Sequence, residues 1–107
     1  MFVVMYRWRL KPGQEAAFRE GWERITRLAH ARCGSLGSAL LTGDDGVWCA
    51  VARWPSREAR EVCFAQSLDD AASELMRDAV AERLPAVEMD MVLDLWAAPI
   101  SLAKETE

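Results

Sequence analysis

The sequence has few of the residues from which most catalytic sites are built. It contains one histidine, one tyrosine and three cysteines among 107 residues. With a single histidine, the spacing of residues does not identify a Ser-His-Asp triad. The sequence also has no glycine-rich phosphate loop. Cys33, Cys49 and Cys63 stand about fifteen residues apart, without Cys-x-x-Cys spacing. We therefore expect buried, reduced thiols, not a zinc site or a disulfide framework.

Signals for a membrane or a nucleic acid are lacking as well. No stretch approaches the roughly 20 consecutive apolar residues of a membrane span. The apolar start of the chain meets arginines at once and does not resemble a secretion signal. A net charge of −4 argues against a nucleic-acid surface. These absences predict a cytoplasmic protein that has neither a membrane nor a nucleic acid as partner.

Apolar residues, in contrast, are abundant. They make up 51% of the chain against 28% charged residues, and they include five tryptophans and five methionines. The length is that of one domain, which we assign to residues 1–97, followed by a C-terminal tail over residues 98–107. The apolar surplus predicts a second buried surface, either at a subunit interface or around a ligand.

The first third of the chain predicts a strand followed by a helix. Residues 2–10 alternate between two faces, one of them apolar, and Pro12-Gly13 ends this strand. From residue 14 the apolar positions recur at helical spacing. Gly34 is well placed to end the helix in a left-handed conformation.

The middle of the chain predicts a hairpin and then an interrupted helix. Residues 36–42 and 47–54 form strands joined by Gly43-Asp44-Asp45-Gly46, residues that tolerate a tight turn. Ser56 is the expected N-cap of the next helix. That helix should break near residues 66–68, restart close to Asp69 and continue to Arg83, where Pro85 stops it.

A last strand over residues 87–95 completes a β-α-β-β-α-β order. This order favours an α+β ferredoxin-like sandwich, in which a four-stranded antiparallel sheet carries both helices on one face. The last strand then lies beside the first, which predicts cross-strand pairing of the bases Arg7, Arg9 and Lys11 with the acids Glu88, Asp90 and Asp94. The opposite sheet face stays apolar, and a second copy on a two-fold axis would cover it.

Three segments carry a resemblance to a known family. They are Lys11-Pro12-Gly13 followed by Phe18, then Gly34-Ser35-Leu36-Gly37-Ser38, and Arg53-Trp54-Pro55-Ser56 leading into Glu58-Ala59. In order and spacing they resemble the antibiotic-biosynthesis-monooxygenase-like family of dimeric α/β barrels. The resemblance implies a ferredoxin-like subunit that forms a homodimer sheet to sheet, with a pocket between sheet and helices.

The resemblance also implies two kinds of activity. Some relatives oxygenate polycyclic aromatic substrates without metal or flavin, because the deprotonated substrate itself activates dioxygen. Others degrade haem, using an asparagine on the first strand with a tryptophan and a histidine on the second helix. The corresponding positions here are Tyr6, Cys63 and Ser73, so haem degradation is disfavoured.

Tyr6 is the candidate catalytic residue, since it corresponds to a pocket-lining position of these relatives. Its phenol could orient or deprotonate an acidic aromatic substrate; the alternative is a core tyrosine with a hydrogen-bonded hydroxyl. The substrate-binding candidates are Trp8, Trp22, Trp54 and Cys63. Plain packing is the alternative for the tryptophans, as is a buried inert thiol for Cys63. His30, near the end of the first helix, fits a solvated surface histidine.

The leading hypothesis is a monooxygenase that needs no cofactor or metal and acts on a small aromatic or quinone-type metabolite. The alternative is a non-catalytic dimeric module that binds a small ligand or serves as a scaffold. Oxygen uptake with aromatic substrates separates the two hypotheses. An RNA-binding domain of the same topology is disfavoured, because residues 47–54 lack the expected basic, glycine-aromatic signature.

Overall fold

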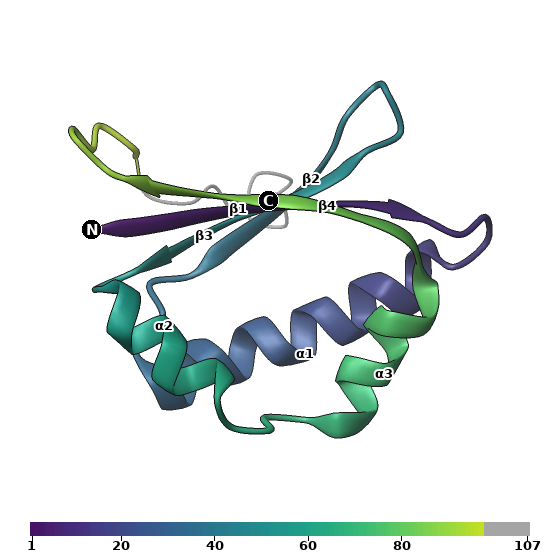
Figure 1. The fold of residues 1–107 in the computed structure, drawn as a ribbon, viewed down its shortest axis with the longest axis horizontal. Helices are drawn as coiled ribbons and strands as arrows, with labels where there is room; N and C mark the ends of the chain where they lie inside the picture. The colour runs from purple at the N-terminus through teal and green to yellow at the C-terminus, as the bar shows by residue number, and fades with distance from the viewer. Residues whose placement is uncertain (98–107) are drawn as a thin grey trace, which may run out of the picture.

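The computed structural model describes residues 1–97, so the expected tail over 98–107 lies outside the described residues. Its strands form one sheet in the order β2-β3-β1-β4, with every neighbouring pair antiparallel. All three helices lie on one face of this sheet (Figure 1). The elements are β1 (Phe2–Leu10), α1 (Glu15–Cys33), β2 (Ser38–Thr42), β3 (Trp48–Trp54), α2 (Arg57–Phe64), α3 (Asp70–Ala79) and β4 (Val80–Asp90). The predicted ferredoxin-like α+β fold is confirmed.

Three helix ends follow from local sequence as predicted. Gly34 has a φ of 74°, and its N–H donates to the Ala29 carbonyl at the end of α1. Ser56 caps α2 by accepting from the Ala59 N–H at 3.1 Å. Asp69 caps α3 in the same way. Because α2 and α3 each have their own cap, the expected break in the second helical region is also confirmed.

The last strand begins earlier than the sequence predicted. Helix α3 ends at Ala79, not at Arg83, and β4 follows at once over Val80–Asp90, not over residues 87–95. Pro85 does not stop the helix; it lies inside this edge strand, where the register with β1 shifts. A bulge on an edge strand tolerates proline, since no ladder hydrogen bond needs its missing N–H.

Because of this shift, the predicted ion pairs between the first and last strands are wrong: the charged residues have other partners. Arg9 lies opposite Glu82 and pairs with it at 3.6 Å. Glu88 contacts Arg57 of α2 instead. Asp94 lies 3.9 Å from Arg53 of β3. The first and last strands are neighbours as predicted, but the bulge moves the acids away from the arginines of β1.

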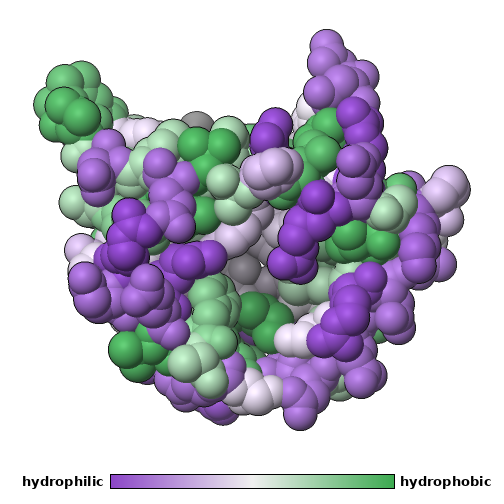
Figure 2. All heavy atoms as spheres, in the orientation of Figure 1, coloured by the Kyte–Doolittle hydropathy of each residue, from purple (hydrophilic) through white to green (hydrophobic). Residues whose placement is uncertain are grey.

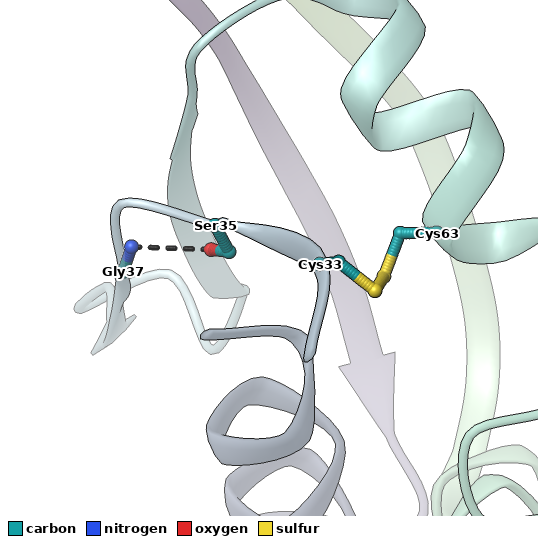
Figure 3. Close-up of a disulfide and its surroundings, with 4 residues drawn as sticks. All are labelled: Cys33, Ser35, Gly37 and Cys63. Carbon is teal, nitrogen blue, oxygen red and sulfur yellow. Dashed lines mark hydrogen bonds between the residues drawn. A yellow bond between two sulfur atoms is a disulfide. The ribbon is translucent and has the colours of Figure 1, made fainter. Parts of the chain in front are cut away.

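A disulfide replaces two of the three free thiols that the sequence predicted. Cys33 is the last residue of α1, and Cys63 lies on α2, where its sulfur is bonded to that of Cys33 (Figure 3). Their Cα atoms are 5.5 Å apart, an ordinary separation for a disulfide. The prediction failed because the fold, not the spacing, brings the two helix segments together. Cys49 is the free cysteine of residues 1–97.

A row of apolar residues crosses the middle of the far face of the sheet. Ala39, Val51, Met5 and Val87 lie opposite one another in register, so they form one row across all four strands. No helix of residues 1–97 lies on this side of the sheet (Figure 1). Beside the row, the side chain of Leu41 is 50% exposed.

The segment after β4 turns toward this far face. The guanidinium carbon of Arg53 lies 5.8 Å from the centre of the Trp96 ring. Hydrophobic atoms gather where this segment lies, at the top left of Figure 2. Trp96 nevertheless remains largely exposed. Within the described chain, none of the helices is both long and apolar enough to span a membrane.

Candidate functional site

A cavity of about 460 Å³ lies between the sheet and the helices. All four strands and all three helices contribute to its walls. In Figure 2 this side of the molecule is hollowed between the two layers, and hydrophobic atoms are visible in the hollow. Its size falls in the range of about 300–1,000 Å³ that is usual for small-molecule sites.

Four of the five predicted site residues line this cavity. Tyr6 and Trp8 are two positions apart on β1, so they share a face, and their rings stack with centroids 6.0 Å apart. Trp22 comes from α1, and Trp54 is the last residue of β3. Cys63 is not among the lining residues, because its sulfur is bonded to Cys33.

The Tyr6 hydroxyl is held by an arginine on α2. Arg60 Nε donates to the Tyr6 oxygen at 2.6 Å, and the guanidinium carbon lies 5.4 Å from the centre of the Tyr6 ring. The phenol oxygen therefore serves as acceptor for Arg60. Its own O–H can still donate a hydrogen bond, and an oxygen atom of a ligand in the cavity can accept that bond.

Arg60 and Phe64 are site residues that the sequence analysis did not assign. They are four positions apart on α2, so both project from one side of the helix into the cavity. Phe64 packs edge-on against Trp54 at 5.6 Å. The apolar side chain of Val62 on the same helix is, in contrast, 66% exposed. Arg60 lies three residues before the buried Cys63, and this spacing places both residues on the same side of the helix. The spacing could therefore have identified Arg60 from the sequence.

The cavity is basic as well as apolar. Its lining includes Arg7, Arg60 and Arg83, whereas no aspartate, glutamate or histidine of residues 1–97 contributes to it. The chain as a whole is acidic, with a net charge of −4. The fold thus places positive charge beside the aromatic walls and leaves the carboxylates elsewhere.

His30 lies outside this cavity. Its side chain is exposed, and its Nδ1 is 2.7 Å from the Ser35 carbonyl oxygen, so Nδ1 carries the proton. It lines a more open groove of about 820 Å³ between α1 and the β2–β3 hairpin, together with Trp48 and Leu40. The expected surface position of His30 is confirmed. No cluster of three metal-ligating side chains occurs among residues 1–97.

Solved structures of other proteins share this fold. SnoaB from Streptomyces nogalater, a cofactor-independent oxygenase, is 16% identical with a TM-score of 0.73, covering 88% of this chain and 95% of SnoaB. A candidate antibiotic biosynthesis monooxygenase from Bordetella bronchiseptica is 24% identical with a TM-score of 0.72, covering 86% of this chain and 97% of that one. Rv0793 from Mycobacterium tuberculosis is 14% identical with a TM-score of 0.72, covering 89% of this chain and 98% of that one.

These likenesses concern the fold, and the sequence itself shows the family. A search of curated proteins finds no match to this chain. The family model of the antibiotic biosynthesis monooxygenases matches residues 1–62, more than half of the chain. That match covers the three segments on which the resemblance was based and the strand that carries Tyr6. The chain therefore belongs to the antibiotic biosynthesis monooxygenase family.

Proposed function

We propose that this protein is a cofactor-independent monooxygenase that acts on a small aromatic or quinone-type metabolite. The observation that carries the proposal is the Tyr6 hydroxyl, oriented by Arg60 at 2.6 Å in a cavity walled by Trp8, Trp22 and Trp54. Such walls fit a planar ring system. Membership in the family supports an oxygenase, as does the shared fold with SnoaB, itself a cofactor-independent oxygenase.

The proposed reaction converts a ring methylene into a carbonyl. The substrate loses a proton to give an enolate, which transfers electrons to dioxygen. One oxygen atom stays on the carbon, and the other leaves as water with the two hydrogens of the methylene. Tyr6 donates its O–H to the enolate oxygen and stabilises the charge that develops there. The tryptophans orient the ring and exclude water.

Oxygen uptake with a panel of hydroxylated anthrones and quinols tests this proposal. Tyr6→Phe removes only the hydroxyl, and we expect it to lower kcat about a hundredfold, the usual cost of losing one such donor. Trp48→Phe is the matched control, since Trp48 lies on the same sheet but outside the cavity. An unchanged rate in Tyr6→Phe would show that the hydroxyl has no part in turnover.

One observation favours the second candidate function, a non-catalytic module that binds a small ligand. Within the described part of the chain, the cavity has no carboxylate or imidazole that could remove a proton. A substrate must then be acidic enough to lose its proton to water, or the protein only binds. Saturable binding of every panel compound without oxygen consumption would establish the binding module and exclude the monooxygenase.

We also propose that two copies pair through the far face of the sheet. The row of Ala39, Val51, Met5 and Val87 needs cover from water, and an identical face on a two-fold axis provides it. Val51→Arg places a charge in the middle of this row. Sedimentation should show a dimer for the unmodified protein and a monomer for Val51→Arg. Val62→Arg, on the exposed side of α2, should leave the dimer intact.

Two further expectations belong to this proposal. Residues 1–97 should form the folding unit, so a chain that ends at Ala97 should melt cooperatively. The protein should reside in the cytoplasm. Cell fractionation tests the location: recovery in the cytoplasmic fraction supports it, whereas recovery outside the cytoplasm would contradict it.

A further inference from the structure

Arg60 has hydrogen-bonding capacity that the protein does not use. Its Nε binds Tyr6, while the terminal nitrogens have no hydrogen-bond partner among residues 1–97. Arg53 and Arg57, which lie nearby in the chain, each form an ion pair with a carboxylate. Arg60 forms none within the described residues, although it is half-buried in an aromatic wall. A guanidinium with accessible terminal nitrogens beside an apolar cavity can bind a carboxylate through two parallel hydrogen bonds.

Unpaired donors occur elsewhere in the same wall. In the part of the chain that the structure describes, three buried side-chain polar atoms lack a partner: Arg7 Nε, Ser38 Oγ and Trp54 Nε1. Ser38 and Trp54 line the cavity, whereas the side chain of Arg7 lies on the far face of the sheet, beside Cys49. Trp54 is only 2% exposed, and its N–H can only donate. Buried polar atoms are rarely left unpaired, so the atoms of Ser38 and Trp54 indicate a ligand that brings acceptor oxygens.

We propose that the ligand of this cavity is an aromatic acid, a planar ring system that carries both a carboxylate and a ring oxygen. The inference rests on the proposed function and names the substrate class of the same site. The terminal nitrogens of Arg60 bind the carboxylate, with Arg83, which lies opposite Trp8, adding positive potential. The donors of Trp54 and Ser38 suit the ring oxygen, and the apolar walls cover the ring faces.

Two probes that differ in one group test the inference. Anthraquinone-2-carboxylate carries the charge, and anthraquinone-2-carboxamide keeps the shape without it. Binding is measured by calorimetry and by quenching of tryptophan fluorescence. We expect the carboxylate to bind the unmodified protein about tenfold more tightly or better, which is the contribution of one charge-assisted hydrogen bond. Equal affinity for both probes, or binding of neither, would overturn the inference without the need for any variant.

Variants then identify the arginine. Arg60→Met should abolish the preference for the carboxylate, and Arg60→Lys should restore part of it, because the charge returns without the planar fork. Arg57→Met is the matched control on the same helix, outside the cavity, and should keep the full preference. A preference that survives in Arg60→Met would overturn the role of Arg60.

Failure of this inference is distinguishable from failure of the proposed function. A carboxylate preference that depends on Arg60, without oxygen uptake on any anthrone, supports the aromatic-acid site and refutes the monooxygenase. Oxygen uptake on uncharged anthrones that Arg60→Met leaves unchanged supports the monooxygenase and refutes the aromatic-acid site.

Discussion

Reduction of the Cys33–Cys63 disulfide should lower the stability of the fold by an amount that follows from its place in the chain. The bond closes a loop with a sequence separation of 30. The entropy that such a loop removes from the unfolded chain corresponds to about 3.6 kcal/mol. Domains of this kind are stable by only about 5–15 kcal/mol. The disulfide thus accounts for a large share of the free energy of unfolding.

Thermal unfolding followed by circular dichroism measures this contribution. The melting temperature of the oxidised protein should exceed that of the protein in excess reductant by on the order of 15 °C, given the unfolding entropy of a chain of this length. Cys33→Ser should melt like the reduced protein under both conditions. Cys33 is the better site for the substitution, because Cys63 is completely buried and a serine hydroxyl there would lack a partner.

Cys49 provides the control for this experiment. It is free in the structure, and burial raises the pKa of its thiol, so it stays protonated at neutral pH. Cys49→Ser should therefore keep the full difference between oxidised and reduced protein. Equal melting temperatures for oxidised and reduced protein, with one labelled cysteine confirmed by mass spectrometry in the oxidised sample, would refute the loop-entropy argument.

Two further substitutions test how the helices are held. Gly21→Ala should lower the free energy of unfolding by about 1–3 kcal/mol, because a Cβ there would lie 2.5 Å from the Ala72 carbonyl oxygen and force α1 and α3 apart. Denaturant unfolding measures this loss, and equal stability of the two proteins would contradict the close approach of the helices. The N–H of Ala72 and the guanidinium of Arg24 lower the pKa of Asp69 from its ordinary 3.8. A carboxyl whose pKa is lowered in the folded protein stabilises the fold at pH values above its ordinary pKa, and this contribution is lost as the pH falls through the pKa of the folded state. The free energy of unfolding should therefore fall less steeply below pH 3.8 in Asp69→Asn than in the unmodified protein. Parallel stability curves of the two proteins would contradict this linkage.

The fold was predictable wherever local chemistry decides the structure. The alternation over residues 2–10 gave β1 its bounds, and the caps at Gly34, Ser56 and Asp69 placed the helix ends. The start of β4 was not predictable from such signals. Residues 80–85 include no cap or turn residue that would mark the end of a helix and the start of a strand. Only the pairing with β1 therefore determines that they form a strand.

The candidate site was predictable in its aromatic residues and not in its polar ones. Tyr6 and Trp8 follow from the strand period, which puts them on the face that the helices cover. The pairing of Arg60 with Tyr6 joins residues 54 positions apart and depends on how α2 lies across the sheet. The same placement of α2 on the end of α1 produced the disulfide. One tertiary contact therefore explains both features that the sequence did not reveal.

Helix α2 links the stability of the fold to the chemistry of the cavity. It carries Arg60 and Phe64 into the cavity, and Cys63, between them in the chain, ties the helix to α1. The inward face of an eight-residue helix is too small to hold it firmly by hydrophobic burial alone. The covalent bond fixes the position from which Arg60 reaches Tyr6. Ligand affinity and thermal stability should therefore decline together when the disulfide is reduced, whereas Arg60→Met should lower the affinity with little change in melting temperature.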